Sequence, residues 1–461
     1  MAIILSGGVV VNGDASFSAD VKIEDEKIKE LGDIKSESGD TVIDVKDKYV
    51  FPGMVDVHTH LDLDTGVTKT ADNFPSGTKA AIAGGTTTIV DFATQTKGRS
   101  LKEGLQEWQE KADLGAYCDY GFHMAVIDWS SDIKAEMQDM LDMGVSSFKM
   151  YMAYKDTLQV DDGIIYEALL RARELGALIG FHCENGDLVK RMSGDLIREG
   201  KTDPYYHPLS RPDTVEEEAI FRLGEIASLT DSDIWVVHLS TEKGLEIIRK
   251  LRRRGVRIVT ESCPQYLLLD ESRYGKEGDK SFEAAKYVIS PPLRKSADIS
   301  ALWQGIKKGD IDFISTDHCS FNFKGQKDLG RDDFTKIPNG ASGLEHRLTL
   351  LYTYGVCENK LELTDMVRLL SKTPGEYLGL TEKGSIAVGK DADIVIYDPA
   401  AEWTISAKTQ IQKADYTPYE GMKAKGRVEK VFLRGEEVYS NGAFTAERPT
   451  GKFQKRKPFK R

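Results

Sequence analysis

Residues 146–182 read SSFKMYMAYKDTLQVDDGIIYEALLRARELGALIGFH and contain one complete strand–helix–strand repeat. The short apolar runs at 146–150 and 178–182 have the length of buried strands. Between them, residues 163–175 carry apolar side chains at helical spacing. A helix that connects two such strands predicts parallel pairing of the strands.

The same alternation continues in both directions along the chain. The six further strands that we predict are Met54–His58, Thr87–Phe92, Gly121–Val126, Ile234–His238, Arg257–Glu261 and Ile311–Asp317. Helical patterns lie between them, for example at 215–229 and 243–254. Eight repeats predict an α/β fold, a (β/α)8 TIM-like barrel. The stretch 191–212 has no clear period, and we expect a loop-rich excursion there, at the barrel mouth or in a subunit contact.

Both ends of the chain lack this strand–helix alternation and contain short runs of residues that favour β-strands. These runs are 3–11, 21–23, 42–45, 392–397 and 428–433, and the pairs Asn12-Gly13, Arg434-Gly435 and Asn441-Gly442 are turn signals between strands. We therefore predict a composite β-sandwich domain from residues 1–52 and 385–445. The barrel then spans 53–384. Residues 446–461 form a basic tail, which we expect to be solvated or to contact another subunit.

Composition limits the classes of partner. The chain has 461 residues and a formal net charge of −12, and its body has no basic stretch. Such a chain is a poor candidate for binding nucleic acid or an anionic membrane. Its five cysteines are scattered and form no CxxC motif, which is typical of a reducing compartment. The N-terminus does not resemble a signal peptide, and no apolar run is long enough to cross a bilayer. We expect a cytoplasmic protein.

Four of the eight histidines stand at the ends of predicted strands: His58, His60, His182 and His238. Asp317 ends the eighth strand. In a barrel of this type the carboxyl ends of all strands meet at one face, where active sites lie. His58 and His60 are two residues apart and so point the same way. Five buried polar groups at one face without a ligand would be costly. The pattern predicts a metal site, with zinc as the first choice and manganese or iron as alternatives.

The number of ligands raises the question of a bridge. Four histidines and one aspartate are too many for one tetrahedral ion with an open position, and too few for two ions unless another group is shared. Lys149 ends the fourth strand and faces the same mouth. As a neutral amine it could add carbon dioxide and become an anionic, bidentate carbamate. A lysine that reaches solvent, or one that pairs with a carboxylate, fits the spacing equally well.

Five motifs together resemble those of a known family: VDVHTHLDLD, SSFKMYMAYK, GFHCEN, VVHLS and STDHC. They resemble the cyclic amidohydrolases, and among these the dihydropyrimidinase and D-hydantoinase branch of the amidohydrolase superfamily. The likeness extends over nearly the whole chain and includes GSIAVGKDADIVIYDP. It implies two divalent metal ions. His58, His60 and Asp317 would bind the first ion, His182 and His238 the second, and carboxylated Lys149 would bridge them.

The resemblance also implies a reaction, the opening of hydantoin or dihydropyrimidine rings to N-carbamoyl amino acids. Asp317 would shuttle the proton and Tyr154 would stabilise the oxyanion. Main-chain groups of Ser290 and Asn339 would bind the cyclic ureide. Leu63, Thr65, Tyr151 and Leu158 would surround the ring substituent. Thr65 stands where the family usually has a bulky apolar residue, and LDLD replaces LDMP, which leaves substituent size and enantiomer open. A homotetramer or homodimer is implied.

Several alternatives stay open beside this interpretation. A dihydroorotase-like enzyme would usually carry an arginine soon after the HxH motif, and none follows His60 here. Allantoinase-like activity is a second possibility, and a scaffold protein that has lost catalysis is a third. We expect His123 to be a core histidine, His318 to point away from Asp317, and Cys319 to take no part as a nucleophile.

Overall fold

The central sheet of the computed structural model, which describes residues 2–279 and 281–459, consists of eight parallel strands in sequence order. The strands are β8 (Met54–Thr59), β9 (Thr86–Thr94), β10 (Asp119–Ala125), β11 (Ser147–Tyr151), β12 (Leu178–His182), β13 (Ile234–Val236), β14 (Ile258–Ser262) and β15 (Phe313–Ile314). The two edges meet where Thr59 pairs with His318, and the His60 N–H donates to the His318 carbonyl at 2.8 Å. The predicted barrel is confirmed.

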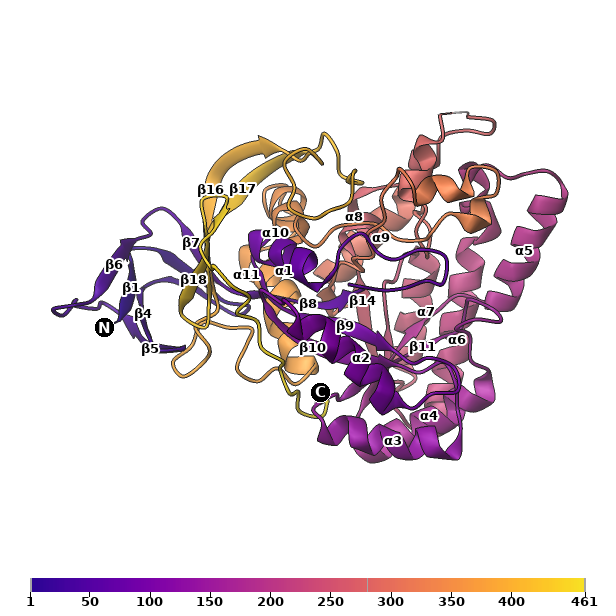
Figure 1. Cartoon of the computed structure of the whole chain (residues 1–461), viewed down its shortest axis with the longest axis horizontal. Helices are drawn as coiled ribbons and strands as arrows, with labels where there is room; N and C mark the ends of the chain where they lie inside the picture. Colours follow the sequence, from indigo (N-terminus) through magenta and orange to yellow (C-terminus); the bar gives the residue numbers. More distant parts are fainter. Residues whose placement is uncertain (1, 280, 460–461) are drawn as a thin grey trace.

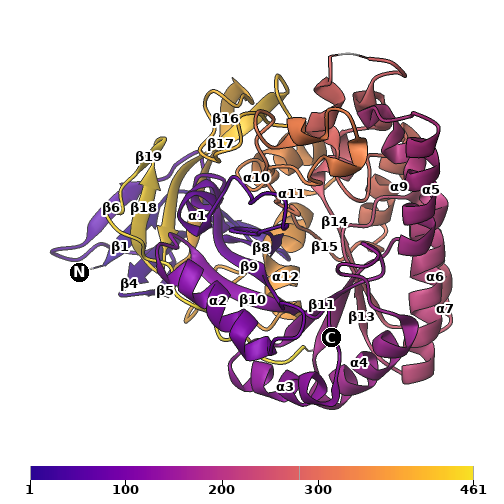
Figure 2. The ribbon, with the colours of Figure 1, turned by 45° about the vertical axis from the view of Figure 1, so that its right-hand side comes forward.

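Helices surround this barrel on its outer side (Figures 1 and 2). They are α1 (Phe74–Ala83), α2 (Leu101–Asp113), α3 (Ser131–Asp142), α4 (Asp162–Leu175), α5 (Gly186–Arg198), α6 (Asp213–Thr230), α7 (Glu242–Arg253), α8 (Pro264–Leu268), α9 (Ser296–Lys307), α10 (Arg347–Leu351), α11 (Leu363–Val367) and α12 (Thr373–Tyr377). Most of the long helices begin at a side chain that accepts a first-turn N–H, a contact that contributes about 1 kcal/mol. The capping residues are Asn73, Ser100, Ser130, Asp161, Asn185 and Thr241.

The prediction of a loop-rich excursion at 191–212 is wrong for its first part. Helix α5 continues through Arg198, and two short 3-10 turns follow at 204–206 and 208–210. The helix begins earlier than the predicted loop, because the Asn185 side chain accepts the N–H of Leu188 at 3.1 Å. The capping residue lies inside the GFHCEN motif, which from the sequence alone we interpret only as part of a metal site, although asparagine is also a favoured N-cap residue.

Two predicted strands end sooner than expected. β13 stops at Val236 and β15 at Ile314, before His238 and Asp317 respectively. His238 has a φ of 39° and Asp317 a φ of 52°, in the left-handed region that interrupts strand pairing. Such backbone conformations cost about 1–3 kcal/mol and gather at functional sites. Both side chains are therefore presented from irregular segments that follow the strands.

A β-rich unit built from both ends of the chain lies beside the barrel (Figure 1). One sheet has the order β5-β4-β1-β6 and the other β19-β18-β17-β16-β7-β2-β3. The strands are β1 (Ile3–Ser6), β2 (Val9–Val11), β3 (Ser16–Ser18), β4 (Asp20–Glu24), β5 (Lys27–Gly32), β6 (Thr41–Asp44), β7 (Tyr49–Pro52), β16 (Ile394–Thr404), β17 (Lys423–Leu433), β18 (Glu436–Ser440) and β19 (Ala443–Phe444). We propose that the domain limits fall at 52/53 and 384/385.

The two sheets share one buried apolar cluster with members from both ends of the chain. Its members are Leu5, Val10, Val21, Ile23, Ile28, Val45, Val50, Ile386, Ala392, Ile394, Ile396 and Phe432. The hairpin turns Arg434-Gly435 and Asn441-Gly442 have positive φ at both residues, as the sequence signals require. Because neither terminal segment supplies this core alone, the unit needs both ends of the chain.

The basic tail packs against the floor of the barrel. The N–H of Tyr120, in β10, donates to the Lys452 carbonyl at 3.1 Å, and the Gln454 N–H donates back to Tyr120 at 2.7 Å. Arg456 is buried and donates to the Ser147 hydroxyl at 2.8 Å. The expectation of a solvated tail is therefore wrong for Arg456, because its two terminal nitrogens donate to Ser147 and to the carbonyls of Phe122 and Leu378.

Two features bear on the environment of the chain. All five cysteines are free thiols, as expected from their scattered positions. Among the described residues, no helix combines the length and the apolar character needed to span a bilayer.

Candidate active site

A cavity of about 720 Å³ opens at the carboxyl ends of the barrel strands. The structure brings every residue that we singled out to its walls. The proposed metal ligands among them are His58, His60, Lys149, His182, His238 and Asp317, and the proposed substrate contacts are Leu63, Thr65, Tyr151, Tyr154, Leu158, Ser290 and Asn339. Their roles remain predictions, which the geometry below supports one by one.

Three ligand atoms converge where the end of β8 meets the irregular segment after β15. Oδ1 of Asp317 lies 3.1 Å from Nε2 of His58 and 3.2 Å from Nε2 of His60. The three groups can place one ligand atom each within 4.8 Å of one another. Burial acts to raise the pKa of Asp317, but His58 and His60 outweigh it and hold that pKa well below its usual range. Two imidazoles and a carboxylate fit a divalent ion of the zinc type.

A second pair of histidines lies next to this cluster. The ring centroids of His182 and His238 are 4.6 Å apart, and that of His238 is 5.6 Å from His58. Nε2 of His182 contacts Glu184, which leaves Nδ1 as the ring nitrogen for a ligand role. Burial lowers the pKa of both His182 and His238. Both rings are therefore neutral near pH 7, the form that binds metal.

Lys149 lies in β11 between the two groups of histidines, and its side chain is only 1% exposed. Nζ sits 5.2 Å from the ring centroid of Phe92 and 5.5 Å from that of Tyr151. Among the described residues, no carboxylate forms an ion pair with it. Burial lowers the pKa of Lys149 to about 8, although Glu261 and Asp317 oppose the shift. The structure thus disfavours both a solvent-exposed lysine and a direct carboxylate pair. A buried amine with a lowered pKa is suited to carbamate formation.

Carboxylates behind the ligands orient two of the histidines. Oε1 of Glu261, in β14, lies 2.7 Å from Nδ1 of His58, and Oε2 of Glu184 lies 2.7 Å from Nε2 of His182. Arg211 donates to Glu184 at 2.7 Å. Burial alone would raise the pKa of Glu184, but Arg211 and His182 lower it to about 2. A partner of this kind fixes the ring and its tautomer.

These orienting residues were missed at the sequence level, although a signal was present. Glu184 stands two residues after His182, and Glu261 ends the predicted seventh strand. Both therefore satisfy the strand-end rule that selected the histidines. A search of strand ends for acidic side chains, in addition to histidines, would have found them.

We expect Glu261→Gln to weaken metal binding about 10–100-fold, because an amide orients and polarises His58 less well than a carboxylate does. Competition with a chromophoric chelator measures the affinity. Glu345→Gln is the matched control, since Glu345 is partly buried and accepts main-chain N–H groups of Ile411 and Gln412, away from the cavity. Unchanged affinity in the Glu261 variant would remove Glu261 from this role.

Tyr154 reaches the cavity from the turn after β11. Its φ of 64° is left-handed, and its carbonyl accepts the N–H of Leu158 at 3.0 Å. The ring centroid lies 5.0 Å from that of His182, and Cζ of Arg211 lies 5.7 Å from it. Burial raises the pKa of Tyr154, so the phenol stays protonated and can donate a hydrogen bond. This is the form that stabilisation of an oxyanion requires.

Ser290 and Asn339 offer main-chain groups to the cavity. Within the described part of the chain, neither the N–H nor the C=O of either residue has a hydrogen-bond partner. Ser290 is buried, and buried main-chain groups are nearly always paired. A cyclic ureide presents alternating N–H and C=O groups, so it would pair with both positions.

Apolar side chains line the outer part of the cavity. Leu63 and Thr65 come from the loop after β8, Tyr151 from the last position of β11, and Leu158 from the turn that follows it. Residues that the sequence did not single out also contribute, namely Val67, Leu329 and Ile337. Val67 and Leu329 are exposed at 72% and 51%. The loop around Leu329 carries no recognisable motif, so only the fold places it at the mouth.

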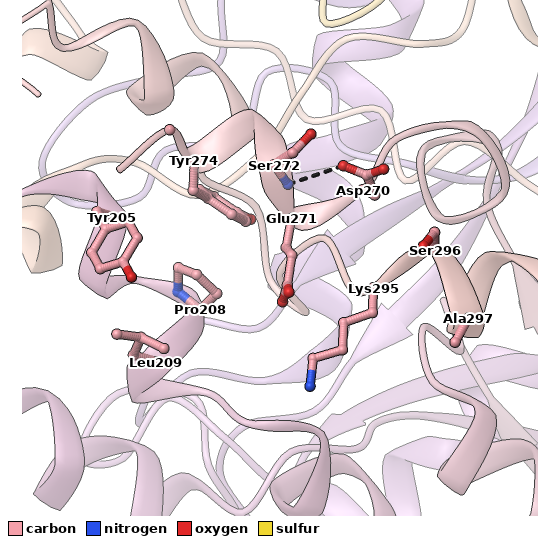
Figure 3. Close-up of a pocket in the computed structure, with 11 residues that line it drawn as sticks. Tyr205, Pro208, Leu209, Asp270, Glu271, Ser272, Tyr274, Lys295, Ser296 and Ala297 are labelled. Carbon is pink, nitrogen blue, oxygen red and sulfur yellow. Dashed lines mark hydrogen bonds between the residues drawn. The ribbon is translucent and has the colours of Figure 1, made fainter. Parts of the chain in front are cut away.

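A second cavity of about 620 Å³ lies elsewhere on the molecule (Figure 3). Its walls are formed by Tyr205, Pro208, Leu209, Asp270, Glu271, Ser272, Tyr274, Gly275, Lys295, Ser296 and Ala297. None of these is a histidine or a cysteine, and the Asp270 carboxylate is occupied by the Ser272 N–H at 2.9 Å. The chemistry-bearing residues are thus at the barrel mouth.

A family model, curated relatives and solved structures that match this chain all point to the same enzyme family. Residues 49–438 match the model of the Amidohydrolase family. D-hydantoinase from Geobacillus stearothermophilus is 43% identical over 458 residues, which cover 99% of this chain and 97% of that protein. D-phenylhydantoinase from Escherichia coli O1:K1 / APEC is 38% identical over 463 residues, covering 100% and 99%. The crystal structure of dihydropyrimidinase from Brevibacillus agri NCHU1002 superposes with a TM-score of 0.97 at 42% identity and covers 100% of both chains.

Proposed function

This chain belongs to the amidohydrolase family, and we propose that it opens the ring of cyclic ureides, hydantoins or dihydropyrimidines, to give N-carbamoyl amino acids. One observation carries the proposal. Four histidines, Asp317 and the buried Lys149 converge on a cavity. Among the described residues, no carboxylate pairs with this lysine, and main-chain groups of the cavity wall have no partner. Its relatives are a D-hydantoinase, a D-phenylhydantoinase and a dihydropyrimidinase.

The donor set fits two divalent metal ions, zinc in preference to manganese. We assign His58, His60 and Asp317 to one ion and His182 and His238 to the other, with carboxylated Lys149 as the bridge. When bound, such a pair lowers the pKa of water and polarises the substrate carbonyl. The ligands must be neutral imidazoles and an ionised carboxylate, and the pKa shifts of His60, His182, His238 and Asp317 favour these forms. The pKa of His58 is instead raised to about 9, because Glu261 and Asp317 outweigh its burial, so a bound cation would have to displace the proton of His58.

The side chains of this protein then have separate tasks. The Asp317 carboxylate accepts a proton from the attacking water and returns it to the ring nitrogen as the C–N bond breaks. The Tyr154 phenol donates to the carbonyl oxygen as it gains negative charge. Main-chain groups of Ser290 and Asn339 bind the N–H and C=O groups of the ureide and so orient the ring in the cavity. The water oxygen forms a bond to the carbonyl carbon, the ring C–N bond breaks, and the proton from the water is transferred to the leaving nitrogen.

The outer cavity favours an apolar or aromatic ring substituent. Leu63, Tyr151 and Leu158 supply apolar surface, and Leu329 and Ile337 add to it. The small Thr65 leaves room beside them. One relative is named a D-phenylhydantoinase, which supports the same class of substrate.

We further propose a homo-oligomer, a tetramer in preference to a dimer. Exposed apolar side chains on α5 and α6 support this, with Leu188, Phe221 and Leu229 exposed at 46%, 46% and 76%. The free thiols are typical of a reducing compartment, which supports a cytoplasmic location. Nucleic acid and membranes are not among the partners that we propose.

The test is ring opening by enzyme that has been stripped with a chelator and then reloaded with zinc or manganese. We expect no activity before reloading and a preference for 5-phenylhydantoin over dihydrouracil of at least about tenfold in kcat/KM, or ~1.4 kcal/mol. A preference for dihydrouracil would contradict the proposed substituent pocket. Failure to open either ring would contradict the function and direct the assay to allantoin and dihydroorotate. A scaffold protein would purify without stoichiometric metal and would stay inactive after reloading.

A further inference from the structure

Lys327 is a fully buried lysine next to the cavity. It begins the short helix η5 (Lys327–Gly330), and its side chain has no exposed area. Nζ donates to the carbonyls of Val288 at 2.7 Å, Pro338 at 2.9 Å and Gly340 at 2.7 Å. In the part of the chain that the structure describes, no carboxylate forms an ion pair with it. Among the described residues, its charge is therefore balanced mainly by main-chain dipoles, with the Phe321 ring centroid 6.0 Å from Nζ.

The three acceptors lie on the two segments that offer main-chain groups to the ureide. Val288 precedes Ser290 by two residues, while Pro338 and Gly340 flank Asn339. One main-chain hydrogen bond joins the segments directly, from the Gly340 N–H to the Val288 carbonyl at 3.2 Å. The Lys327 ammonium therefore supplies most of the polar contact that holds the segments together.

The number of acceptors matches the charged form of this side chain. An ammonium has three N–H donors, whereas a neutral amine has two and would leave one carbonyl facing a lone pair. Burial lowers the pKa of Lys327 to about 7. The hydrogen bonds from its Nζ to three carbonyls favour the protonated form of the side chain. A buried charge without a counter-ion is costly, and an apolar side chain could fill the same space. Packing alone therefore does not account for a lysine here.

The direction of the peptide groups links Lys327 to the substrate. In a trans peptide the C=O and N–H point to opposite sides. The Pro338 carbonyl points to Lys327, so the N–H of the same peptide, which belongs to Asn339, points away from it. That N–H has no partner among the described residues. An ammonium on the carbonyl side polarises the peptide and strengthens the N–H as a donor.

We propose that Lys327 is a positioning residue that ties segment 288–290 to segment 338–340 and so holds the main-chain groups that receive the cyclic ureide. This inference rests on the proposed function. It assigns substrate positioning to a side chain that itself does not line the cavity. Removing the tie separates the two segments, while the metal ligands on the barrel strands stay in place.

The test compares Lys327→Met, which keeps the length of the side chain and removes its donors, with Lys324→Met as the matched control. Lys324 is exposed and lies three residues earlier on the same segment. With 5-phenylhydantoin, we expect KM of the Lys327 variant to rise about tenfold or more, with a smaller change in kcat, the pattern for lost ground-state binding. Hydrogen exchange should accelerate in peptides covering 286–292 and 336–342. The control should match the wild type in both measurements.

A second variant covers the case in which Lys327→Met does not fold. Lys327→Gln retains two N–H donors, and its KM should lie between those of the wild type and the methionine variant. Wild-type KM together with wild-type exchange in either folded variant would overturn the proposal, even if the melting temperature fell. If the wild type opens no cyclic ureide, the proposed function is wrong, and the exchange rates alone still decide whether Lys327 ties the two segments.

Discussion

Lys149→Ala should lower kcat/KM at least about 10³-fold, equivalent to ~4 kcal/mol of transition-state stabilisation. The side chain is buried between His58, His60 and the pair His182 and His238, where only an anionic form would suit two cations. The variant should also bind less metal, because the bridging ligand is gone. Steady-state kinetics and elemental analysis of the same preparation measure both losses.

Chemical rescue separates a carbamate from an ammonium at this position. The alanine variant leaves space for a small molecule, so acetate or propionate should restore part of the activity and of the metal content. Ethylammonium of similar size should restore neither. Rescue by the amine and not by the acid would contradict carboxylation of Lys149. As an independent check, metal-free wild-type enzyme reloaded in buffer without carbon dioxide should gain activity only after bicarbonate is added.

The barrel could be predicted from the sequence because its signals are local. A short run of apolar residues indicates each strand, and the 3.6-residue spacing of apolar residues indicates each long helix. The rule that active sites form at the carboxyl ends of barrel strands then gathered His58, His60, His182, His238 and Asp317 at one cavity, where the structure has them. The exact ends of β13 and β15 were not predictable, since they depend on the left-handed backbone of His238 and Asp317.

What remained hidden depends on contacts between distant segments. Glu261 orients His58 across 203 residues of chain, and Arg456 meets Ser147 across 309. A glutamate or an arginine is usually solvated, so composition alone favours an exposed position for both. Only the fold shows that segments distant in sequence supply hydrogen-bond partners, which offset the cost of burying Glu261 and Arg456. Lys327 belongs to the same class, because its three carbonyl acceptors come from two separate loops.

Asp317→Asn should lower kcat about 10²–10⁴-fold, the usual size of a general acid–base contribution. The substitution keeps the shape of the side chain but removes its charge and its ability to carry a proton. In the wild type, burial acts to raise the pKa of Asp317, and His58 and His60 outweigh it, so the carboxylate is ionised near pH 7 and ready to accept a proton. Pre-steady-state and steady-state rates with 5-phenylhydantoin measure the loss.

Asp317 is also a proposed ligand, so the two roles must be separated. The amide oxygen of the variant can still coordinate a cation, although more weakly than a carboxylate does. At saturating metal, we therefore expect the variant to hold metal and bind substrate with a KM near that of the wild type, while kcat stays low. Asp128→Asn, at an exposed loop where the carboxylate accepts the Gly98 N–H, serves as control and should keep wild-type kcat. A metal-loaded Asp317 variant with nearly normal kcat would mean that another group carries the proton. Tyr154, the other proposed proton donor in the cavity, would then be the next candidate, and Tyr154→Phe should show the loss of kcat instead.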